Sequence, residues 1–412
     1  MNTAGYSASQ IRFSEANNTV SRAPASYWLL LAFLFLLYAN LPLVFPALDA
    51  VRPAQAVAGL ALVMLLAEWT FSRKRFVFAY PEALLLLAFL GAAVMSSLTA
   101  LWPRFAVESV ADLAKMTVVF FFILNCVNTE SRLRGVMWTL VIGGLLPAAG
   151  ALRNYAQGNL VEGRAAWIGT FANPNELAYS LVILLPLAAF LATGLSLLPR
   201  LALLGVALIY VGAIMVSFSR GGLLGLAAVM AFCAWRKRSV VLRGLMVLLV
   251  VAGLFFAGRF WSRGEDFQNL SADVSFQQRL ATSQAGLAMF FDHPLFGVGL
   301  GCSVVAWPLY APEGLYTRGA LVTHNTFIQA MSETGIIGFA PFMLFVGFGL
   351  YYVRRQARDC SQPGLANLSS GIEIALWGFL VCGMSGGYVL TWYPYILLGM
   401  AASARQIGRQ SR

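Results

Sequence analysis

Residues 325–353 read NTFIQAMSETGIIGFAPFMLFVGFGLYYV, and this stretch decides the fold class. A helix of about 20 predominantly apolar residues crosses the hydrocarbon core of a bilayer, and this stretch exceeds that length. The whole chain has the same character, with 59% hydrophobic residues, 11% charged residues and a mean hydropathy of +0.74. A soluble globular domain carries roughly 25% charged residues. The sequence therefore predicts an all-α polytopic membrane protein.

Further segments reach or approach the same length and apolar content, which gives about 12 predicted transmembrane helices. In chain order they are 27–48, 54–71, 81–101, 105–126, 133–152, 177–198, 201–218, 222–235, 240–260, 325–353, 372–390 and 393–404. The inner segments of this arrangement hold 18 of the 28 Lys and Arg residues, as cytoplasmic segments do. We therefore expect both termini in the cytoplasm. The net charge of +11 then reflects topology and not binding to nucleic acid, because no basic stripe is interleaved with aromatic residues.

The predicted spans divide the chain into five parts. These are a cytoplasmic N-terminal segment (1–26), transmembrane helices 1–9 (27–260), a long periplasmic loop (261–324), transmembrane helices 10–12 (325–404) and a cytoplasmic tail (405–412). The first span is expected to be an uncleaved anchor, because residues 1–26 show no signal-peptide cleavage pattern.

The long loop is predicted to be partly helical. Residues 275–291 have helical spacing, with Leu280, Leu287 and Phe291 on one face, so this helix is expected to lie on the membrane surface. The run Gly297-Val298-Gly299-Leu300-Gly301 lacks the strand and helix of a nucleotide-binding fingerprint and predicts a turn.

His324 is one of only two histidines in 412 residues, and it directly precedes the apolar stretch at 325–353. It could help to cap the helix at the membrane surface, or it could accept a proton during catalysis. The other histidine, His293, precedes a proline in a predicted turn and is expected to be structural. Glu333 lies nine residues after His324, about two and a half helical turns, so we expect it on the opposite face, in helix packing.

Nine arginines fall on the predicted outer side, where topology disfavours them: Arg52, Arg104, Arg153, Arg164, Arg220, Arg259, Arg263, Arg279 and Arg318. Arg220 lies in a very short turn, Ser217–Gly222, and Arg279 lies on the polar side of the loop helix. Both could anchor the protein to lipid head groups by snorkelling. A guanidinium also binds two phosphate oxygens at once, which makes these two residues candidates for phosphate recognition.

Acidic residues of the outer loops are scattered, and no pair has the spacing expected of a divalent-cation site next to a diphosphate. The five cysteines show no zinc-site spacing, and disulfides are not expected. The sequence therefore predicts a site without a metal or another cofactor.

Four stretches on the predicted outer side together resemble the bacterial superfamily of O-antigen ligases and O-antigen polymerases, and most closely the ligases. They are Gly169–Ala178, Ser217–Gly222, Arg279 with Phe291–Gly299, and His324–Phe327 with Glu333–Gly335. The resemblance implies a GT-C-like integral-membrane glycosyltransferase of the bacterial inner membrane, with its active site facing the periplasm. Its donor would be an undecaprenyl-diphosphate-linked O-antigen glycan, and its acceptor the lipid A-core oligosaccharide.

The resemblance also implies residue roles. His324 would accept the proton of the acceptor hydroxyl, while Arg220 and Arg279 would stabilise the departing diphosphate. A single displacement would invert the anomeric centre. Asn173, Asn175 and Asn325 are weaker site candidates, because the Asn173-Pro174-Asn175 turn also fits a helix cap.

Two other functions stay open. A polymerase of O-antigen or exopolysaccharide would use the same site with a second lipid-linked glycan as acceptor. A polysaccharide transporter or flippase would also have many spans and buried charges. No internal repeat of hydropathy supports transport, and the polar residues concentrate outside the predicted bilayer.

Overall fold

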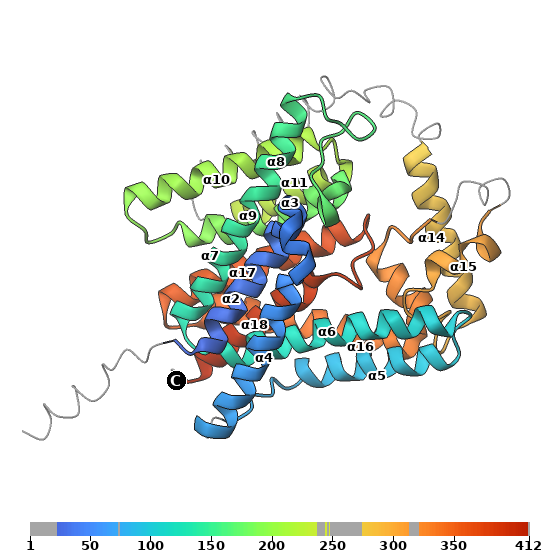
Figure 1. Cartoon of the computed structure of the whole chain (residues 1–412), viewed down its shortest axis with the longest axis horizontal. Coiled ribbons are helices and arrows are strands. Elements are labelled where there is room, and N and C mark those ends of the chain that lie inside the picture. The colour runs from blue at the N-terminus through green and yellow to red at the C-terminus, as the bar shows by residue number, and fades with distance from the viewer. Residues whose placement is uncertain are drawn as a thin grey trace, which may run out of the picture.

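The computed structural model describes residues 23–72, 75–236, 244, 247, 274–312 and 321–410, which are helical with connecting turns (Figure 1). The first half contains α2 (Ala25–Ala39), α3 (Leu41–Val44), α4 (Pro53–Ser72), α5 (Glu82–Leu98), α6 (Pro103–Cys126), α7 (Glu130–Gly143), α8 (Leu145–Ala156) and α9 (Pro174–Leu191). The second half contains α10 (Leu197–Val216), α11 (Arg220–Arg236), α14 (Val274–Asp292), α15 (Ser303–Tyr310), α16 (Thr326–Asp359), α17 (Pro363–Gly383) and α18 (Trp392–Gln410). Two short 3-10 helices, η1 (Pro46–Val51) and η2 (Gly169–Ala172), complete the described elements. The predicted all-α fold is confirmed.

Six helical segments of the described chain are long and apolar enough to cross a membrane: 53–71, 130–156, 174–191, 197–216, 326–359 and 363–383. Helices α2 and α5 are shorter but equally apolar. These helices make the chain an integral membrane protein with several spans. The predicted ninth span, 240–260, lies outside the described residues except for positions 244 and 247.

Several predicted spans differ in their ends from the helices of the structure. The segment expected at 372–390 is α17, which begins at Pro363 and ends at Gly383, and the segment expected at 325–353 is α16, which continues to Asp359. The segment expected at 27–48 ends as a helix at Ala39, because Asn40 has a left-handed backbone (φ 49°) and Pro42 follows it in α3. The segment expected at 133–152 consists of α7 and α8, which meet at Gly144. The last helix does not end at residue 404 but continues to Gln410.

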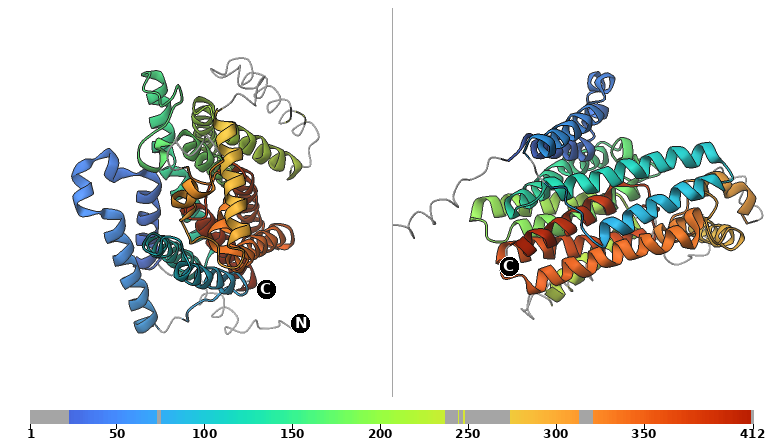
Figure 2. Two further views of the ribbon diagram at one scale, coloured as in Figure 1. Left: turned by 90° about the vertical axis from the view of Figure 1, so that its right-hand side faces the viewer. Right: turned by 90° about the horizontal axis from the view of Figure 1, so that it is seen from below.

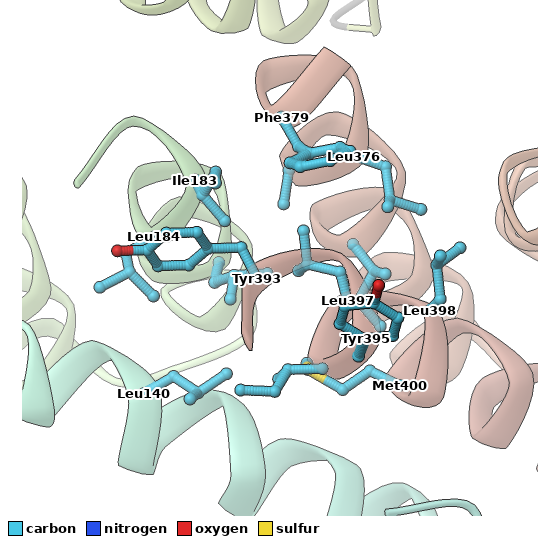
Figure 3. Close-up of a cluster of buried hydrophobic side chains, with 14 of the residues drawn as sticks. Leu140, Ile183, Leu184, Leu376, Phe379, Tyr393, Tyr395, Leu397, Leu398 and Met400 are labelled. Atoms are coloured by element: carbon cyan, nitrogen blue, oxygen red, sulfur yellow. The ribbon is translucent and has the colours of Figure 1, made fainter. Parts of the chain in front are cut away.

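Helices α9 and α17 form the centre of the bundle and are the most buried of the six candidate spans. Figure 3 shows part of the core that they build with α7 and α18. Its side chains are apolar or aromatic and include Leu140, Leu184, Phe379 and Tyr393. The helices are therefore fixed relative to one another by packing inside the bundle.

Helix α14 lies across one end of the bundle, and the C-terminus lies at the other end (Figures 1 and 2). The predicted helix at 275–291 is thus confirmed. One face of α14 packs Ala281, Ala285 and Met289 against the turn before α15 and against α15 itself. The predicted apolar face is exposed, with Leu280 46% and Phe291 73% accessible. Its contact with a membrane stays a prediction.

The glycine run at 297–301 is a turn, as predicted, with positive φ at Gly297, Gly299 and Gly301. It is inserted against an interruption of α16 at Gly335, whose backbone is non-helical (φ 59°, ψ −167°). Backbone groups that the interruption frees form hydrogen bonds to the inserted turn and to the residues just before it. Val298 N donates to Ser332 O at 2.9 Å, and Ile336 N donates to Pro294 O at 2.9 Å. A broken helix at membrane depth needs such partners, because no water replaces them there.

Glu333 holds the same turn through its side chain. Its buried carboxylate accepts hydrogen bonds from Gly301 N at 2.9 Å and from Ser303 Oγ at 2.6 Å, while Gln329 Nε2 lies 3.4 Å away. Glu333 therefore joins α16 to the turn before α15. This is the packing role expected from its position, and it fixes the end of the bundle next to α14.

Candidate functional site

A cavity of about 660 Å³ opens at the end of the bundle where α14 lies. Its walls come from three distant parts of the chain: the turn before α9 with the start of α9, the first turns of α14, and the residue two positions before α16. The lining residues are Val161, Glu162, Arg164, Ala172, Asn173, Pro174, Asn175, Gln278, Arg279 and His324. Four predicted site residues, Asn173, Asn175, Arg279 and His324, thus share one cavity.

The backbone that follows His324 is held by hydrogen bonds of Asn325 and Thr326. Asn325 caps α16, since its Oδ1 accepts from Phe327 N at 2.9 Å and from Ile328 N at 3.1 Å. Thr326 Oγ1 donates to Gly386 O at 2.7 Å and accepts from Tyr388 N at 3.0 Å, in the segment between α17 and α18. Asn325 is not among the lining residues of the cavity. Its Oδ1 caps the helix, and its Nδ2 donates to Met384 O at 3.4 Å, after α17, so Asn325 positions His324.

His324 is half-buried, and its imidazole lies within reach of a positive charge. Burial, and next the charge of Arg279, lower the pKa of His324 to about 4 from its usual 6.5. The imidazole is therefore neutral at physiological pH. Only a neutral imidazole has a free nitrogen that can accept a proton.

Arg164 is the buried arginine of this cavity, with 9% of its surface accessible. Its Nη2 donates to Asn175 Oδ1 at 2.6 Å, and its Nε donates to Ser217 O at 2.9 Å. Ser219 Oγ donates to the same Asn175 Oδ1 at 2.8 Å. Asn175 thereby connects the wall of the cavity to the turn between α10 and α11.

A tight turn presents Arg164 and Glu162 to the cavity. Val161 and Arg164 exchange both backbone hydrogen bonds, at 2.8 and 3.0 Å, across Glu162 and Gly163. Both central residues have positive φ, 51° and 73°, as in type I′ turns. The turn therefore places the carboxylate of Glu162 and the guanidinium of Arg164 on the same wall of the cavity.

Arg220 begins α11 and is half-buried, but it is not among the lining residues of the cavity. It follows Ser219, which bonds to the cavity residue Asn175. The preceding Phe218 has a left-handed backbone (φ 47°), so the turn is sharp. The predicted contact of Arg220 with a diphosphate stays a prediction.

Asn173 has the capping role that its sequence context suggested as an alternative. Its Oδ1 accepts from Asn175 N at 2.9 Å at the start of α9, where Pro174 occupies the first helical position. Asn173 is also exposed and lines the cavity, so the cap does not exclude contact with a ligand.

Three polar lining residues were not singled out from the sequence: Glu162, Arg164 and Gln278. Arg164 belonged to the nine outer arginines, and this was its only signal. The turn that positions it and its long-range bond to Ser217 have no periodic pattern in the sequence. Gln278 precedes Arg279 in the loop helix and enters the cavity with it.

The cavity combines two guanidinium groups, a neutral imidazole, one carboxylate and three side-chain amides. Guanidinium groups recognise phosphate, and amide and carboxylate groups recognise sugar hydroxyls. A neutral imidazole can accept a hydroxyl proton. The lining is thus suited to a ligand that carries both phosphate and sugar.

Part of the chain is similar to known proteins. Residues 205–343 match the Wzy_C domain, described as O-antigen ligase. The exopolysaccharide production protein ExoQ of Rhizobium meliloti (strain 1021) is 29% identical over 193 residues, which cover 43% of this chain and 44% of that protein. This chain therefore aligns with less than half the length of that relative.

A chain of a solved structure, described as "Structural coordination of polymerization and crosslinking by a peptidoglycan synthase complex", is similar to this chain. The superposition has a TM-score of 0.48 and 16% sequence identity, and covers 82% of this chain and 99% of that chain. The Gly169–Ala178 stretch lies outside the region matched to the family, whereas Arg220, Arg279 and His324 lie inside it. The match of residues 205–343 to the Wzy_C domain agrees with the family that the sequence motifs resemble.

Proposed function

We propose that this protein is an O-antigen ligase, which transfers an O-antigen polysaccharide from undecaprenyl diphosphate to lipid A-core oligosaccharide on the periplasmic side of the inner membrane. The proposal rests chiefly on one observation: the neutral imidazole of His324 shares a cavity with the guanidinium groups of Arg164 and Arg279. These are a proton acceptor and two anion-binding groups at the end of a membrane-embedded bundle.

The position and the charge of the cavity support a lipid-linked donor. Outside the cytoplasm a glycosyltransferase has no nucleotide sugar, so its donor must be linked to lipid. The diphosphate of such a donor lies at head-group depth, next to its lipid tail. The first turns of α14 offer Arg279 and Gln278 to a group at that depth, beside the exposed apolar residue Leu280.

The reaction is a single displacement. The acceptor hydroxyl attacks the anomeric carbon of the donor glycan and gives its proton to His324. The bond between that carbon and the diphosphate oxygen breaks, and the electron pair leaves with undecaprenyl diphosphate. Arg279 and Arg164, together with Arg220 at the first position of α11, stabilise the negative charge of the leaving group, so no metal ion is required. The anomeric configuration is inverted.

Donor binding also prepares the base. The charge of Arg279 contributes to the low pKa of His324. A bound diphosphate opposes that charge and raises the pKa of the imidazole, which makes it a stronger base only when the donor is present. The free enzyme would thus keep its base weak.

A second candidate function is polymerisation of exopolysaccharide, and the similarity to an exopolysaccharide production protein favours it. The same residues would then serve a second lipid-linked glycan as the acceptor. Both reactions leave the donor half of the mechanism unchanged. They differ only in the molecule that provides the hydroxyl.

The test uses the purified full-length protein in detergent with a lipid-linked glycan donor. One reaction receives lipid A-core and another receives only a second portion of lipid-linked glycan. Product with lipid A-core supports the ligase, and elongated lipid-linked glycan supports the polymerase. If neither product forms while the same protein moves lipid-linked glycan across a sealed vesicle, the protein is a transporter and the proposal is wrong.

A further inference from the structure

A second cavity is lined by the end of α18. This end of the bundle, where the C-terminus lies, is opposite to α14 (Figures 1 and 2). Its volume is about 170 Å³, several times the roughly 30 Å³ that a water molecule occupies in the liquid. The polar groups of its wall come from the last two turns of α18, and its apolar wall includes Phe78 before α5. This cavity takes no part in the function proposed above.

Arg405 is the buried charge of this cavity, with 5% of its surface accessible. Its Nη2 donates to Glu82 Oε2 at 2.7 Å and to Tyr80 O at 2.8 Å. Its guanidinium carbon lies 4.1 Å from the centre of the Tyr352 ring. These contacts fix the guanidinium plane.

The Nη1 atom of Arg405 is buried and has no hydrogen-bond partner in the described part of the chain. A buried donor on a charged group is costly when it stays unpaired. The neighbouring carboxylate of Glu82 is bonded to Nη2 through Oε2, while its buried Oε1, like Nη1, has no hydrogen-bond partner in the described part of the chain. The Arg405–Glu82 pair thus keeps unused hydrogen-bonding capacity next to a cavity that the described residues do not fill.

The surroundings select a negatively charged acceptor. Arg409 lies one helical turn after Arg405 and is exposed at the cavity, and Gln406 and Gln410 add amide groups. No Asp or Glu is among the described residues that line the cavity. Glu82 balances one arginine, so one positive charge remains. Two guanidinium groups four residues apart on a helix suit the oxygens of one phosphate.

Apolar surface next to the cavity indicates that the phosphate belongs to a lipid. Phe78 lines the cavity and is 45% exposed, and Phe76 beside it is 49% exposed. Both rings pack against Phe121, at 6.0 and 5.6 Å between ring centres, so they form a fixed apolar surface. A free phosphate would gain nothing from these rings, whereas an acyl chain would cover them.

We propose that the cavity at the end of α18 binds the phosphate of an anionic phospholipid, with Arg405 and Arg409 as its ligands and the acyl chains against Phe76 and Phe78. Basic pockets between transmembrane helices bind lipid head groups in this manner. The lipid would tie the end of α18 to the start of α5, which Arg405 already joins through Glu82. The site would therefore stabilise the bundle at the end remote from His324.

The test measures thermal unfolding of the purified full-length protein as phosphatidylglycerol is titrated into detergent, beside titrations with phosphatidylcholine and with inorganic phosphate. A ligand that binds the folded state raises the unfolding temperature with concentration. Arg409→Gln is the main variant, because Arg409 is exposed and its loss leaves the Arg405–Glu82 pair intact. Arg355→Gln is the control: it removes another exposed arginine, which is paired with Asp359 at the end of α16 and is not among the residues that line the cavity.

We expect phosphatidylglycerol, but not phosphatidylcholine, to stabilise the wild-type protein and Arg355→Gln. The apparent affinity of Arg409→Gln should be lower by about tenfold or more, the loss of one charge-assisted contact. Equal stabilisation of Arg409→Gln by phosphatidylglycerol would overturn the site. Stabilisation by inorganic phosphate to the same extent would show that the ligand of the site is not a lipid. If none of the three compounds raises the unfolding temperature, both the site and its lipid ligand are wrong.

Discussion

Arg279 and His324 line the same cavity, and the charge of the arginine contributes to the lowering of the histidine pKa to about 4. The two residues are 45 positions apart in the sequence and meet because α14 lies across the bundle next to the start of α16. The arginine thus suppresses protonation of the base in the absence of an anion. An anion that binds to Arg279 reverses this effect.

The pH dependence of Arg279→Gln tests this relationship. In the wild-type protein the acid limb of kcat/KM should fall near pH 4, because kcat/KM reports the pKa of the free enzyme and the neutral imidazole exists above that pKa. Removal of the arginine charge raises the pKa of His324, while burial, the larger cause, remains. The acid limb of kcat/KM should therefore shift to higher pH but stay below pH 6.5, the usual pKa of a histidine.

Loss of Arg279 should also weaken binding of the diphosphate. One charge-assisted contact contributes about 1.5–3 kcal/mol, so kcat/KM should fall about tenfold to a hundredfold at pH 7. Arg104→Gln removes an exposed arginine paired with Glu108 and provides the control. An acid limb that does not move in Arg279→Gln would show that the two residues are not coupled.

Asn175 should matter more for stability than Asn173, although both are asparagines of one turn that line the cavity. Asn175→Ala leaves Arg164 Nη2 and Ser219 Oγ without their shared acceptor, at a cost of about 1–3 kcal/mol in unfolding free energy. Asn173→Ala removes a single helix cap, at about 1 kcal/mol. Thermal unfolding of both variants in one detergent measures the difference, and equal losses would argue against the network around Arg164.

Gly335 should tolerate no side chain. Its backbone (φ 59°, ψ −167°) is in a region open almost only to glycine, and a Cβ there would collide with the backbone of Leu295. Gly335→Ala should lower the unfolding free energy by more than about 1–3 kcal/mol. Gly347→Ala is the matched control in the same helix, because a Cβ at Gly347 meets nothing within 4 Å. A Gly335→Ala protein as stable as Gly347→Ala would contradict the inserted turn.

Glycan transfer should not depend on a divalent cation. The positive charges of Arg164 and Arg279 line the cavity and can meet the charge of a diphosphate without a metal ion. Activity after treatment with EDTA, and after addition of Mg²⁺ or Mn²⁺ to the treated protein, should match that of the untreated protein. Loss of activity with EDTA and its recovery with Mg²⁺ would show that a metal ion, and not the two arginines, stabilises the departing diphosphate.

The sequence predicted the long apolar helices, though not all of their ends, because apolar length determines them. It predicted α14 because Leu280, Leu287 and Phe291 recur at helical spacing. It did not predict the interruption of α16. The apolar run at 325–353 reads as one continuous span, and only the tertiary contact with the inserted glycine turn stabilises the left-handed Gly335.

The site was predicted in part for a similar reason. His324 and Arg279 stood out because charged and titratable residues are rare in such a chain and their flanking motifs resemble one family. Arg164 did not stand out in the sequence. Its place in the cavity depends on hydrogen bonds to Ser217, 53 residues away, and to Asn175, 11 residues away. Contacts of this kind have no signature in one sequence.

Transfer by His324→Ala tests the central claim most directly. The purified variant should form product from lipid-linked glycan and acceptor at least about 100 times more slowly than the wild-type protein, the usual contribution of a general base. The other histidine provides the control: His293 is described only with backbone hydrogen bonds, to Met289 O and from Gly297 N, which His293→Ala keeps. Slow transfer by His324→Ala together with near wild-type transfer by His293→Ala is the predicted result. Full transfer by a correctly inserted His324→Ala protein would contradict the account.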